Sequence, residues 1–275
     1  MPVHWFPGHM AKARRLVQEN LKLVDVVIEL LDARIPYSSR NPLINEILGS
    51  KPRLVVLNKA DLADPALTRE WLKWYEKQGF PSLAVDSLRR QGTEQVPALV
   101  RERGKGASQK PAIRCMVVGI PNVGKSFFIN ALARRKATRT GDRPGVTRGK
   151  QWVRLERDLE LLDTPGVLWP RYEDLEVALK LAATGAIKEE IYDAAEVATW
   201  LARWLGQHYP ASLAERYGFD GTNGVGAHRF LECVARKRNM LGPGGAPDLY
   251  RAALHFLREF RRGLLGRITL DFPPR

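Results

Sequence analysis

Two kinds of apolar pattern alternate along the first 166 residues of the chain. Short apolar runs, typical of buried strands, are separated by longer stretches with apolar residues three or four positions apart, typical of helices. Strands are expected at Val24–Leu31, Arg53–Leu57, Ser82–Val85, Ile113–Gly119, Gln151–Leu155 and Leu159–Leu162. Helices are expected at Met10–Leu21, Asn41–Leu48, Pro65–Gln78, Thr93–Arg103 and Gly124–Ala133. The alternation predicts an α/β domain with a doubly wound, mostly parallel sheet.

Beyond about residue 170 only the helical spacing remains. Helix-breaking residues such as Gly242-Pro243-Gly244-Gly245 separate the helical stretches. The stretches are Leu175–Thr184, Ala194–Leu205, His228–Lys237 and Leu249–Arg262. We therefore expect an α/β domain over residues 1–172, followed by a small all-α domain over residues 173–275.

The composition indicates a globular chain of the cytoplasm. With 275 residues, 44% of them hydrophobic, the chain is long enough to bury a substantial core. Its two cysteines, Cys115 and Cys233, form neither a disulfide framework nor a metal-binding pattern. No apolar run reaches the length of a membrane span, and Met1–Met10 lacks the apolar stretch of a signal peptide.

The charge balance favours a polyanionic partner. Lys and Arg number 44 against 30 Asp and Glu, which gives a net charge of +14. Residues Arg134–Arg157 and Gly226–Arg275 hold two dense basic clusters. A uniformly basic, solvated surface is the alternative. An anionic membrane is a less suitable partner, because the sequence has no amphipathic anchor or lipidation motif.

The most specific motif is a phosphate-binding loop. Gly119-Ile120-Pro121-Asn122-Val123-Gly124-Lys125-Ser126 follows an apolar strand and opens a predicted helix. Its glycines let backbone N–H groups turn toward phosphates, Lys125 supplies a positive charge, and Ser126 can ligate Mg²⁺. The nucleotide-binding residues expected here are Asn122, Val123, Gly124, Lys125, Ser126 and Phe127.

Two later segments are candidates for sensing the terminal phosphate. Asp163-Thr164-Pro165-Gly166 ends a predicted strand, so Asp163 is expected to hold Mg²⁺ through water and the Gly166 N–H to face the γ-phosphate. Thr147 is either a further Mg²⁺ ligand or an ordinary loop threonine.

A second motif, Asn58-Lys59-Ala60-Asp61, is expected to recognise guanine. The Asp61 carboxylate can accept hydrogen bonds from the ring N–H and the exocyclic amine of guanine, which adenine does not present as a pair. Asn58 would hold the loop and contact the base edge, while the Lys59 stem would lie along the ring. Asp86 and Ser87 follow the next strand and are expected to complete the base pocket. An ATP-using enzyme is disfavoured by Asp61.

The catalytic residue is less evident. GTPases commonly use a glutamine after the D-x-x-G motif to orient water, whereas Val167 stands here. His9 has a side chain suited to orienting or deprotonating water near neutral pH. The alternative is that His9 is a surface residue at a helix start, and that hydrolysis is slow.

The order of the motifs is reversed relative to an ordinary GTPase, in which the phosphate loop comes first. In this order and in its motifs the chain resembles the circularly permuted GTPases over nearly its whole length. Further matching segments are Trp5-Phe6-Pro7-Gly8-His9-Met10-Ala11-Lys12-Ala13, Asp32-Ala33-Arg34-Ile35-Pro36, Pro144-Gly145-Val146-Thr147, Tyr209-Pro210, Glu215-Arg216-Tyr217-Gly218 and Leu264-Leu265-Gly266-Arg267-Ile268. Phe127-Phe128 and Asp86 depart from the usual pattern without removing a phosphate or Mg²⁺ contact.

The resemblance implies GTP hydrolysis stimulated by the large ribosomal subunit and a C-terminal domain that binds RNA. It also implies a role in hydrolysis for His9. At Asn122 it implies a K⁺ ligand, with a structural asparagine as the alternative. We expect an assembly factor for the large subunit that binds in the GTP state and leaves on hydrolysis; a nucleotide-gated adaptor with incidental turnover is the rival. The expected RNA-binding residues are Arg236, Lys237, Arg238, Arg261 and Arg262.

Overall fold

The computed structural model describes residues 15, 17–40, 46–106, 112–134, 151–163, 174–219 and 227–274, and divides the chain into two compact units. The larger unit comprises Pro2–Glu173 and Thr269–Arg275, and the smaller one contains Asp174–Ile268. This division differs from the expected boundaries at the C-terminus. Residues 269–275 belong to the larger unit instead of the helical one.

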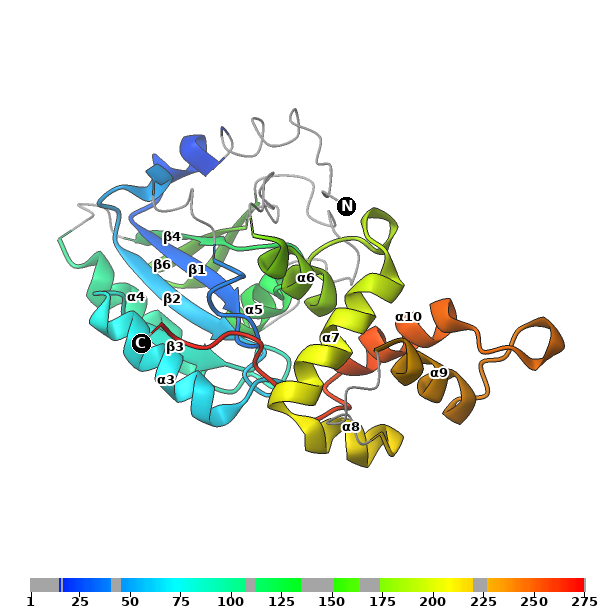
Figure 1. The fold of residues 1–275 in the computed structure, drawn as a ribbon. Helices are drawn as coiled ribbons and strands as arrows, with labels where there is room; N and C mark the ends of the chain where they lie inside the picture. Colours follow the sequence, from blue (N-terminus) through cyan, green and yellow to red (C-terminus); the bar gives the residue numbers. More distant parts are fainter. Residues whose placement is uncertain are drawn as a thin grey trace. The chain divides into compact units, whose positions relative to one another are not determined.

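A six-stranded sheet forms the centre of the larger unit (Figure 1). Its strands lie in the order β3-β2-β1-β4-β6-β5, and all neighbouring pairs are parallel except β5 with β6. The bounds are β1 Val26–Asp32, β2 Arg53–Asn58, β3 Ser82–Val85, β4 Ile113–Val118, β5 Gln151–Glu156 and β6 Leu159–Asp163. The predicted fold class, a mostly parallel α/β sheet followed by helices, is confirmed.

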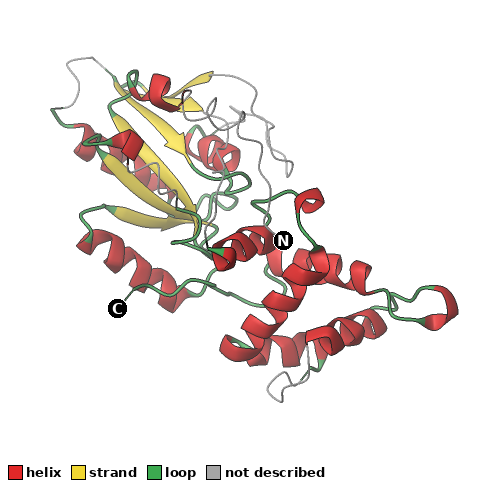
Figure 2. Cartoon of the chain, turned by 45° about the horizontal axis from the view of Figure 1, so that its top comes forward, coloured by secondary structure: helices red, strands yellow, loops and turns green. Residues whose placement is uncertain are grey.

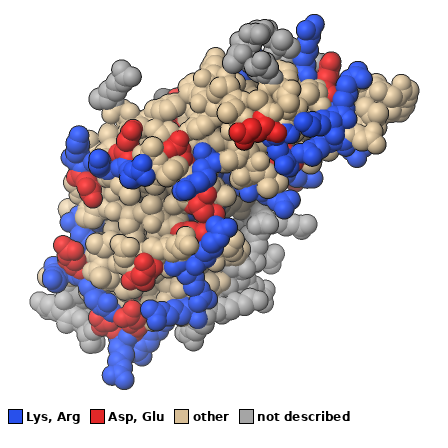
Figure 3. Space-filling view, turned by 90° about the horizontal axis from the view of Figure 1, so that it is seen from below, with Lys and Arg blue, Asp and Glu red and all other residues tan. Residues whose placement is uncertain are grey.

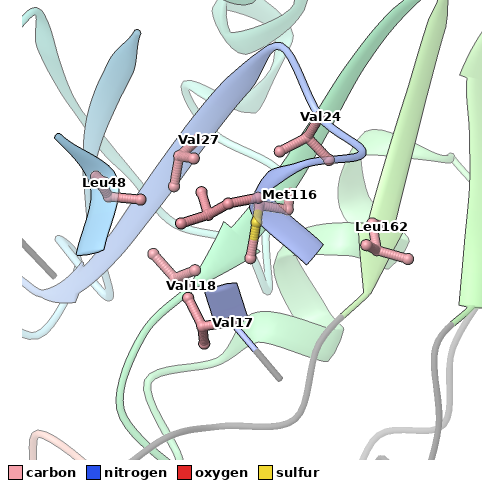
Figure 4. Close-up of a cluster of buried hydrophobic side chains, with 8 residues drawn as sticks. Val17, Val24, Val27, Leu48, Met116, Val118 and Leu162 are labelled. Carbon is pink, nitrogen blue, oxygen red and sulfur yellow. The ribbon is translucent and has the colours of Figure 1, made fainter. Parts of the chain in front are cut away.

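Apolar side chains cover both faces of this sheet, as a parallel sheet between helices requires. One buried cluster contains Val27, Met116 and Leu162 from three strands, together with Val17 and Leu21 (Figure 4). The other cluster packs strand residues Leu31, Val55 and Leu57 against Trp71 and Tyr75 of helix α3, which spans Pro65–Lys77. Figure 2 shows helices (red) lying beside the strands (yellow) of this sheet.

In the larger unit α3 begins at a side-chain cap, whereas the two helices that follow it in the chain have none. Helix α3, Pro65–Lys77, starts with the Asp64 carboxylate accepting hydrogen bonds from the Ala66 and Leu67 N–H groups and with proline in its first turn. A short 3₁₀ turn, η1 at Thr93–Gln95, leads into α4, Val96–Gly104. Helix α5, Lys125–Leu132, follows the phosphate-binding loop. The expected helix 93–103 is therefore two elements.

The smaller unit consists of five helices and two 3₁₀ turns within its described residues. The bounds are α6 Leu175–Thr184, α7 Ala194–His208, α8 Pro210–Tyr217, α9 Ala227–Lys237 and α10 Leu249–Arg261, with η2 at Glu189–Ile191 and η3 at Pro243–Gly245. Its core includes Leu205, Tyr217, Phe230 and Phe256. No helix in the described part of the chain is long and apolar enough to cross a membrane.

Two polar networks, one centred on a buried carboxylate and one partly exposed, stabilise the helical unit. Glu259 of α10, 4% exposed, accepts hydrogen bonds from the Tyr217 hydroxyl and from the guanidinium groups of Arg216 and Arg238. Burial alone would raise the pKa of Glu259, but these donors lower it from 4.5 to about 2. The carboxylate is thus ionised in the folded protein at any ordinary pH.

The second network caps the end of α6. The Arg261 guanidinium donates to the carbonyls of Ala182 and Ala183 at 2.9 and 3.0 Å, and to Glu189 at 2.7 Å. Carbonyls in the last turn of a helix have no partner within it, so a cation satisfies them well. Arg261 and Arg238, two of the residues expected to bind RNA, therefore also hold the helical unit together.

We expect Glu259→Gln to lower the free energy of unfolding of the helical unit by about 1–3 kcal/mol at pH 7, since charged hydrogen bonds are lost. The lowered pKa makes this contribution fully present above the ordinary value of 4.5, and it disappears as the pH falls toward about 2. Amide hydrogen exchange across α8 and α10 at pH 7 and pH 3 measures it, with the exposed Glu215→Gln as a matched control. A difference between Glu259→Gln and wild type that does not shrink on acidification would contradict this assignment.

Candidate nucleotide-binding site

The parallel strands bring the predicted site loops to one edge of the sheet. Asp32 at the end of β1 is in register with Asn58 at the end of β2, which is in register with Val85 at the end of β3. The phosphate-binding loop leaves β4, the other neighbour of β1, at the same edge. The carboxyl ends of parallel strands are the usual ligand site of a doubly wound sheet.

Two glycines let the phosphate-binding loop lie close to its neighbours. A Cβ atom on Gly119 would come within 2.5 Å of the Leu30 carbonyl oxygen, and one on Gly124 within 2.4 Å of Asn58 Nδ2. Gly124 also has a φ of +97°, a conformation that side chains with Cβ rarely adopt. The glycine positions of the motif are thus required by contacts that reach outside the loop.

Lys125 and Ser126 open helix α5, where N–H groups have no partner within the helix. Lys125 is 9% exposed, and its ammonium donates to the carbonyls of Gly119 and Ile120 at 3.1 and 2.7 Å. It is therefore held within the curve of the loop. Phe128 is fully buried, whereas Phe127 is 37% exposed, so only the second of the two unusual phenylalanines packs into the core.

Asn58 joins three of the predicted segments. Its amide nitrogen donates to the Val123 carbonyl of the phosphate-binding loop at 2.7 Å. Its amide oxygen accepts from the Ser87 N–H at 3.2 Å and from the Ser87 hydroxyl at 2.7 Å. The two motifs, 65 residues apart in the chain, and the segment at Ser87 are thereby fixed to one another by one buried side chain.

Lys59 crosses from the base-recognition motif to the phosphate-binding loop. Its ammonium donates to the Asn122 carbonyl at 2.6 Å and to Asp32 Oδ2 at 3.0 Å. Its backbone has a φ of 60°, and Asn122 has a φ of 57°, values that cost free energy in residues other than glycine. The surrounding hydrogen bonds hold both residues in these conformations.

Asp61 and Asp86 lie on either side of an arginine that the sequence did not single out. Arg89 Nη1 is 3.2 Å from Asp61 Oδ2 and 3.0 Å from Asp86 Oδ2. Burial and the nearby Asp86 carboxylate raise the pKa of Asp61, and the Arg89 guanidinium opposes that rise. Asp86 also accepts hydrogen bonds from the Leu88 and Arg89 N–H groups, so it shapes the turn that presents Arg89.

Asp32 and Arg34 form a buried ion pair that supports the site through Lys59, a role that was not predicted from the sequence. Arg34, 1% exposed, donates to Asp32 through Nε at 2.9 Å and Nη2 at 2.7 Å, and Asp32 also accepts the Lys59 ammonium. Burial would raise the pKa of Asp32, but the charges of Arg34 and Lys59 hold it well below its usual range. The sequence signal for this role was an acidic residue at the end of a buried strand with an arginine two positions later.

Other predicted site residues fall outside this geometry. His9, Thr147, Gly166 and Val167 lie outside the described residues. Asp163 is the last residue of β6, the strand paired with β4, but its side chain is likewise not described.

A family model described as "50S ribosome-binding GTPase" matches residues 114–202. Ribosome biogenesis GTPase A of Priestia megaterium is 48% identical over 282 residues, which cover 99% of this chain and 98% of that protein. Mitochondrial ribosome-associated GTPase 1 of Mus musculus is 40% identical over 97% of this chain and 89% of that protein.

Among solved structures, GNP-bound YlqF from T. maritima is 29% identical with a TM-score of 0.68, covering 95% of this chain and 98% of that one. The similarity thus extends across both units, well beyond the phosphate-binding loop. Taken with the reversed order of the two nucleotide motifs, it shows that the chain belongs to the ribosome biogenesis GTPase A family of circularly permuted GTPases.

Proposed function

We propose that this GTPase assembles the large ribosomal subunit, binding the precursor in its GTP state and leaving after hydrolysis. The single observation that carries the nucleotide part is Asn58, which ties the guanine motif, the phosphate-binding loop and Ser87 into one pocket wall. The ribosomal partner is inferred from the relatives, whose names describe ribosome biogenesis and ribosome association.

In this proposal the guanine base lies between the Lys59 stem and the Asp61 carboxylate. Asp61 is partly exposed, at 22% for its side chain, and so remains accessible to the two N–H donors of guanine. Arg89 donates to one oxygen of this carboxylate, and acceptor positions are left for the base because a carboxylate has about four of them. Ser87, which donates to Asn58, would form the remaining wall of the guanine pocket.

The phosphates would lie against the start of α5, with backbone N–H groups from Asn122 to Phe127 directed at them. The Lys125 ammonium is already inside the curve of the loop and can reach phosphate oxygens from there. The GTPase family generally uses Mg²⁺. The hydroxyl of Ser126 and the carboxylate of Asp163 are oxygen donors of the kind Mg²⁺ prefers, and they come from α5 and β6 at the same sheet edge.

Such an ion neutralises charge that develops on the transferred phosphoryl group. Thr147 is assigned as a further Mg²⁺ ligand and Gly166 as a γ-phosphate contact, both by motif alone. K⁺ is proposed at Asn122 for the same reason; equal turnover in sodium and potassium buffers would exclude it.

His9 is the proposed residue for positioning the attacking water, since Val167 stands where a glutamine is usual. A His9→Ala variant should bind GTP normally and lose turnover. Full turnover in that variant would remove His9 from the mechanism.

The helical unit is the proposed RNA-binding element. On the face drawn in Figure 3, Lys and Arg side chains gather toward the end formed by the last helices, with few acidic side chains among them. Arg229 and Arg236, seven positions apart on α9, are exposed on one side of that helix, and Lys237 and Arg262 are exposed as well. These residues can reach phosphates without giving up the internal ion pairs of Arg238 and Arg261.

Co-sedimentation with purified large ribosomal subunits tests the proposal. Binding should be stronger with a non-hydrolysable GTP analogue than with GDP, and should weaken steeply as salt is raised. Binding equal in both nucleotides would exclude GTP-gated assembly. We place this activity in the cytoplasm, in keeping with two free thiols, of which Cys115 is buried.

A further inference from the structure

Residues Thr269–Asp271 are buried in the larger unit, although they directly follow the helical unit in the sequence. Thr269 and Leu270 are 0% exposed and Asp271 is 3% exposed, whereas the next residue, Phe272, is 51% exposed. We call Thr269–Asp271 the C-terminal clasp. Figure 1 draws it in red beside α3, and the Trp71 indole N–H of that helix donates to the Asp271 carbonyl at 3.1 Å.

The clasp holds the loop that follows β1. The Leu270 N–H donates to the Arg34 carbonyl at 2.7 Å. The Asp271 carboxylate accepts from the N–H groups of Tyr37 and Ser38 at 2.9 and 2.7 Å, and from the Ser38 hydroxyl at 2.8 Å. Four hydrogen bonds therefore fix the position of this loop from residues more than 230 positions away.

The clasp also holds the loop that follows β2. The Thr269 hydroxyl accepts from the Asp64 N–H at 3.0 Å and donates to the Ala33 carbonyl at 3.4 Å. Asp64 is the N-cap of α3 and ends the short loop that carries Lys59 and Asp61. One hydroxyl thus joins the far end of the guanine-recognition loop to the loop after β1.

We propose that the C-terminal clasp is a positioning element of the guanine pocket. Leu270 fixes Arg34, Arg34 fixes the Asp32 carboxylate, and Asp32 receives the Lys59 ammonium, while Thr269 fixes the end of the Asp61 loop. No clasp residue is expected to touch the nucleotide. This inference rests on the proposed guanine-binding role of Lys59 and Asp61.

Docking of the clasp and binding of guanine are then coupled in both directions. If the docked clasp favours the arrangement that binds the base, a bound base must favour the docked clasp by the same factor. Because the clasp continues the chain from the helical unit, the nucleotide pocket gains a covalent connection to that unit through Thr269.

Two truncations of the full chain test the proposal. Removing residues 269–275 deletes the clasp, and removing residues 273–275 is the matched control that retains it. We expect the first truncation to weaken GDP binding about 10-fold, the effect of roughly 1.4 kcal/mol, and the second to change it less than about 2-fold. Asp271→Asn keeps the volume of the side chain and is the variant to use if the first truncation fails to fold.

A base-specific readout separates positioning from a loss of stability. Inosine diphosphate lacks the exocyclic amine that Asp61 is proposed to bind, so the ratio of GDP to inosine diphosphate affinity reports the placement of Asp61. The ratio should fall when the clasp is removed and should persist in the control. Hydrogen exchange at the Leu270 amide of the full chain should also slow when GDP binds.

A clasp-free chain with unchanged GDP affinity and an unchanged ratio would overturn the positioning role and leave the proposed function intact. A lowered melting temperature with both binding quantities unchanged would equally overturn it, because the clasp would then be structural only. A full-length chain that fails to bind GDP would overturn the proposed function itself, and the inference with it.

Discussion

Replacing Lys125 by alanine is expected to weaken GDP and GTP binding by about 10²- to 10³-fold. The ammonium is held inside the phosphate-binding loop by the carbonyls of Gly119 and Ile120, so it meets a phosphate without a change of loop conformation. Charged hydrogen bonds contribute roughly 1.5–3 kcal/mol each, and two of them account for this loss. Isothermal titration calorimetry with GDP and Mg²⁺ measures the effect.

Lys105→Ala is the matched control for that experiment, because Lys105 is an exposed lysine just after α4. It should bind GDP as the wild type does. The melting temperature of the Lys125→Ala chain without nucleotide should be measured as well, since the loss of a buried ammonium also removes two internal hydrogen bonds. Unchanged GDP affinity in a folded Lys125→Ala chain would refute the assignment of this loop.

Replacing Asp61 by asparagine is expected to change which base the protein binds. A carboxylate accepts from both N–H donors of guanine, whereas an amide presents one acceptor and one donor. The amide matches xanthine, which has a carbonyl where guanine has an amine. Sites that leave a polar group of the wrong base unpaired discriminate by roughly 10⁴, so GDP affinity should fall by at least about 10² while that for xanthosine diphosphate rises.

The neighbouring acid provides the control for this base switch. Asp86→Asn should keep the preference for GDP, because Asp86 accepts backbone N–H groups of its own turn and pairs with Arg89. If Asp61→Asn retained the wild-type preference for GDP, the guanine-reading role would belong to another residue.

Much of the larger unit could be predicted from the sequence. All six strands were expected from short apolar runs, and their bounds differ by at most two residues from the observed ones. Glu29 interrupts the first run, and within the strand its buried carboxylate pairs with the Arg53 guanidinium of β2 at 3.0 Å. Helix α8 was not predicted from spacing, since Pro210–Tyr217 is short; Pro210 in its first turn was the missed start signal.

The parts of the site that are formed by contiguous sequence motifs could be predicted. The two nucleotide motifs lie at one sheet edge, because parallel strands end there. The contacts between the motifs could not be predicted from the sequence, because they link residues far apart in the chain. They join Asn58 to Val123, Lys59 to Asp32, and the clasp to both loops. Counting basic residues also could not show that Arg238 and Arg261 are engaged by Glu259 and Glu189.

The proposed role in large-subunit assembly is tested by GTP turnover in potassium buffer, measured with and without purified large ribosomal subunits. We expect slow turnover by the protein alone, since Val167 replaces the usual glutamine, and strong stimulation by the subunit. Turnover that stays the same over a range of subunit concentrations, together with no nucleotide-dependent binding to subunits, would contradict the role in large-subunit assembly.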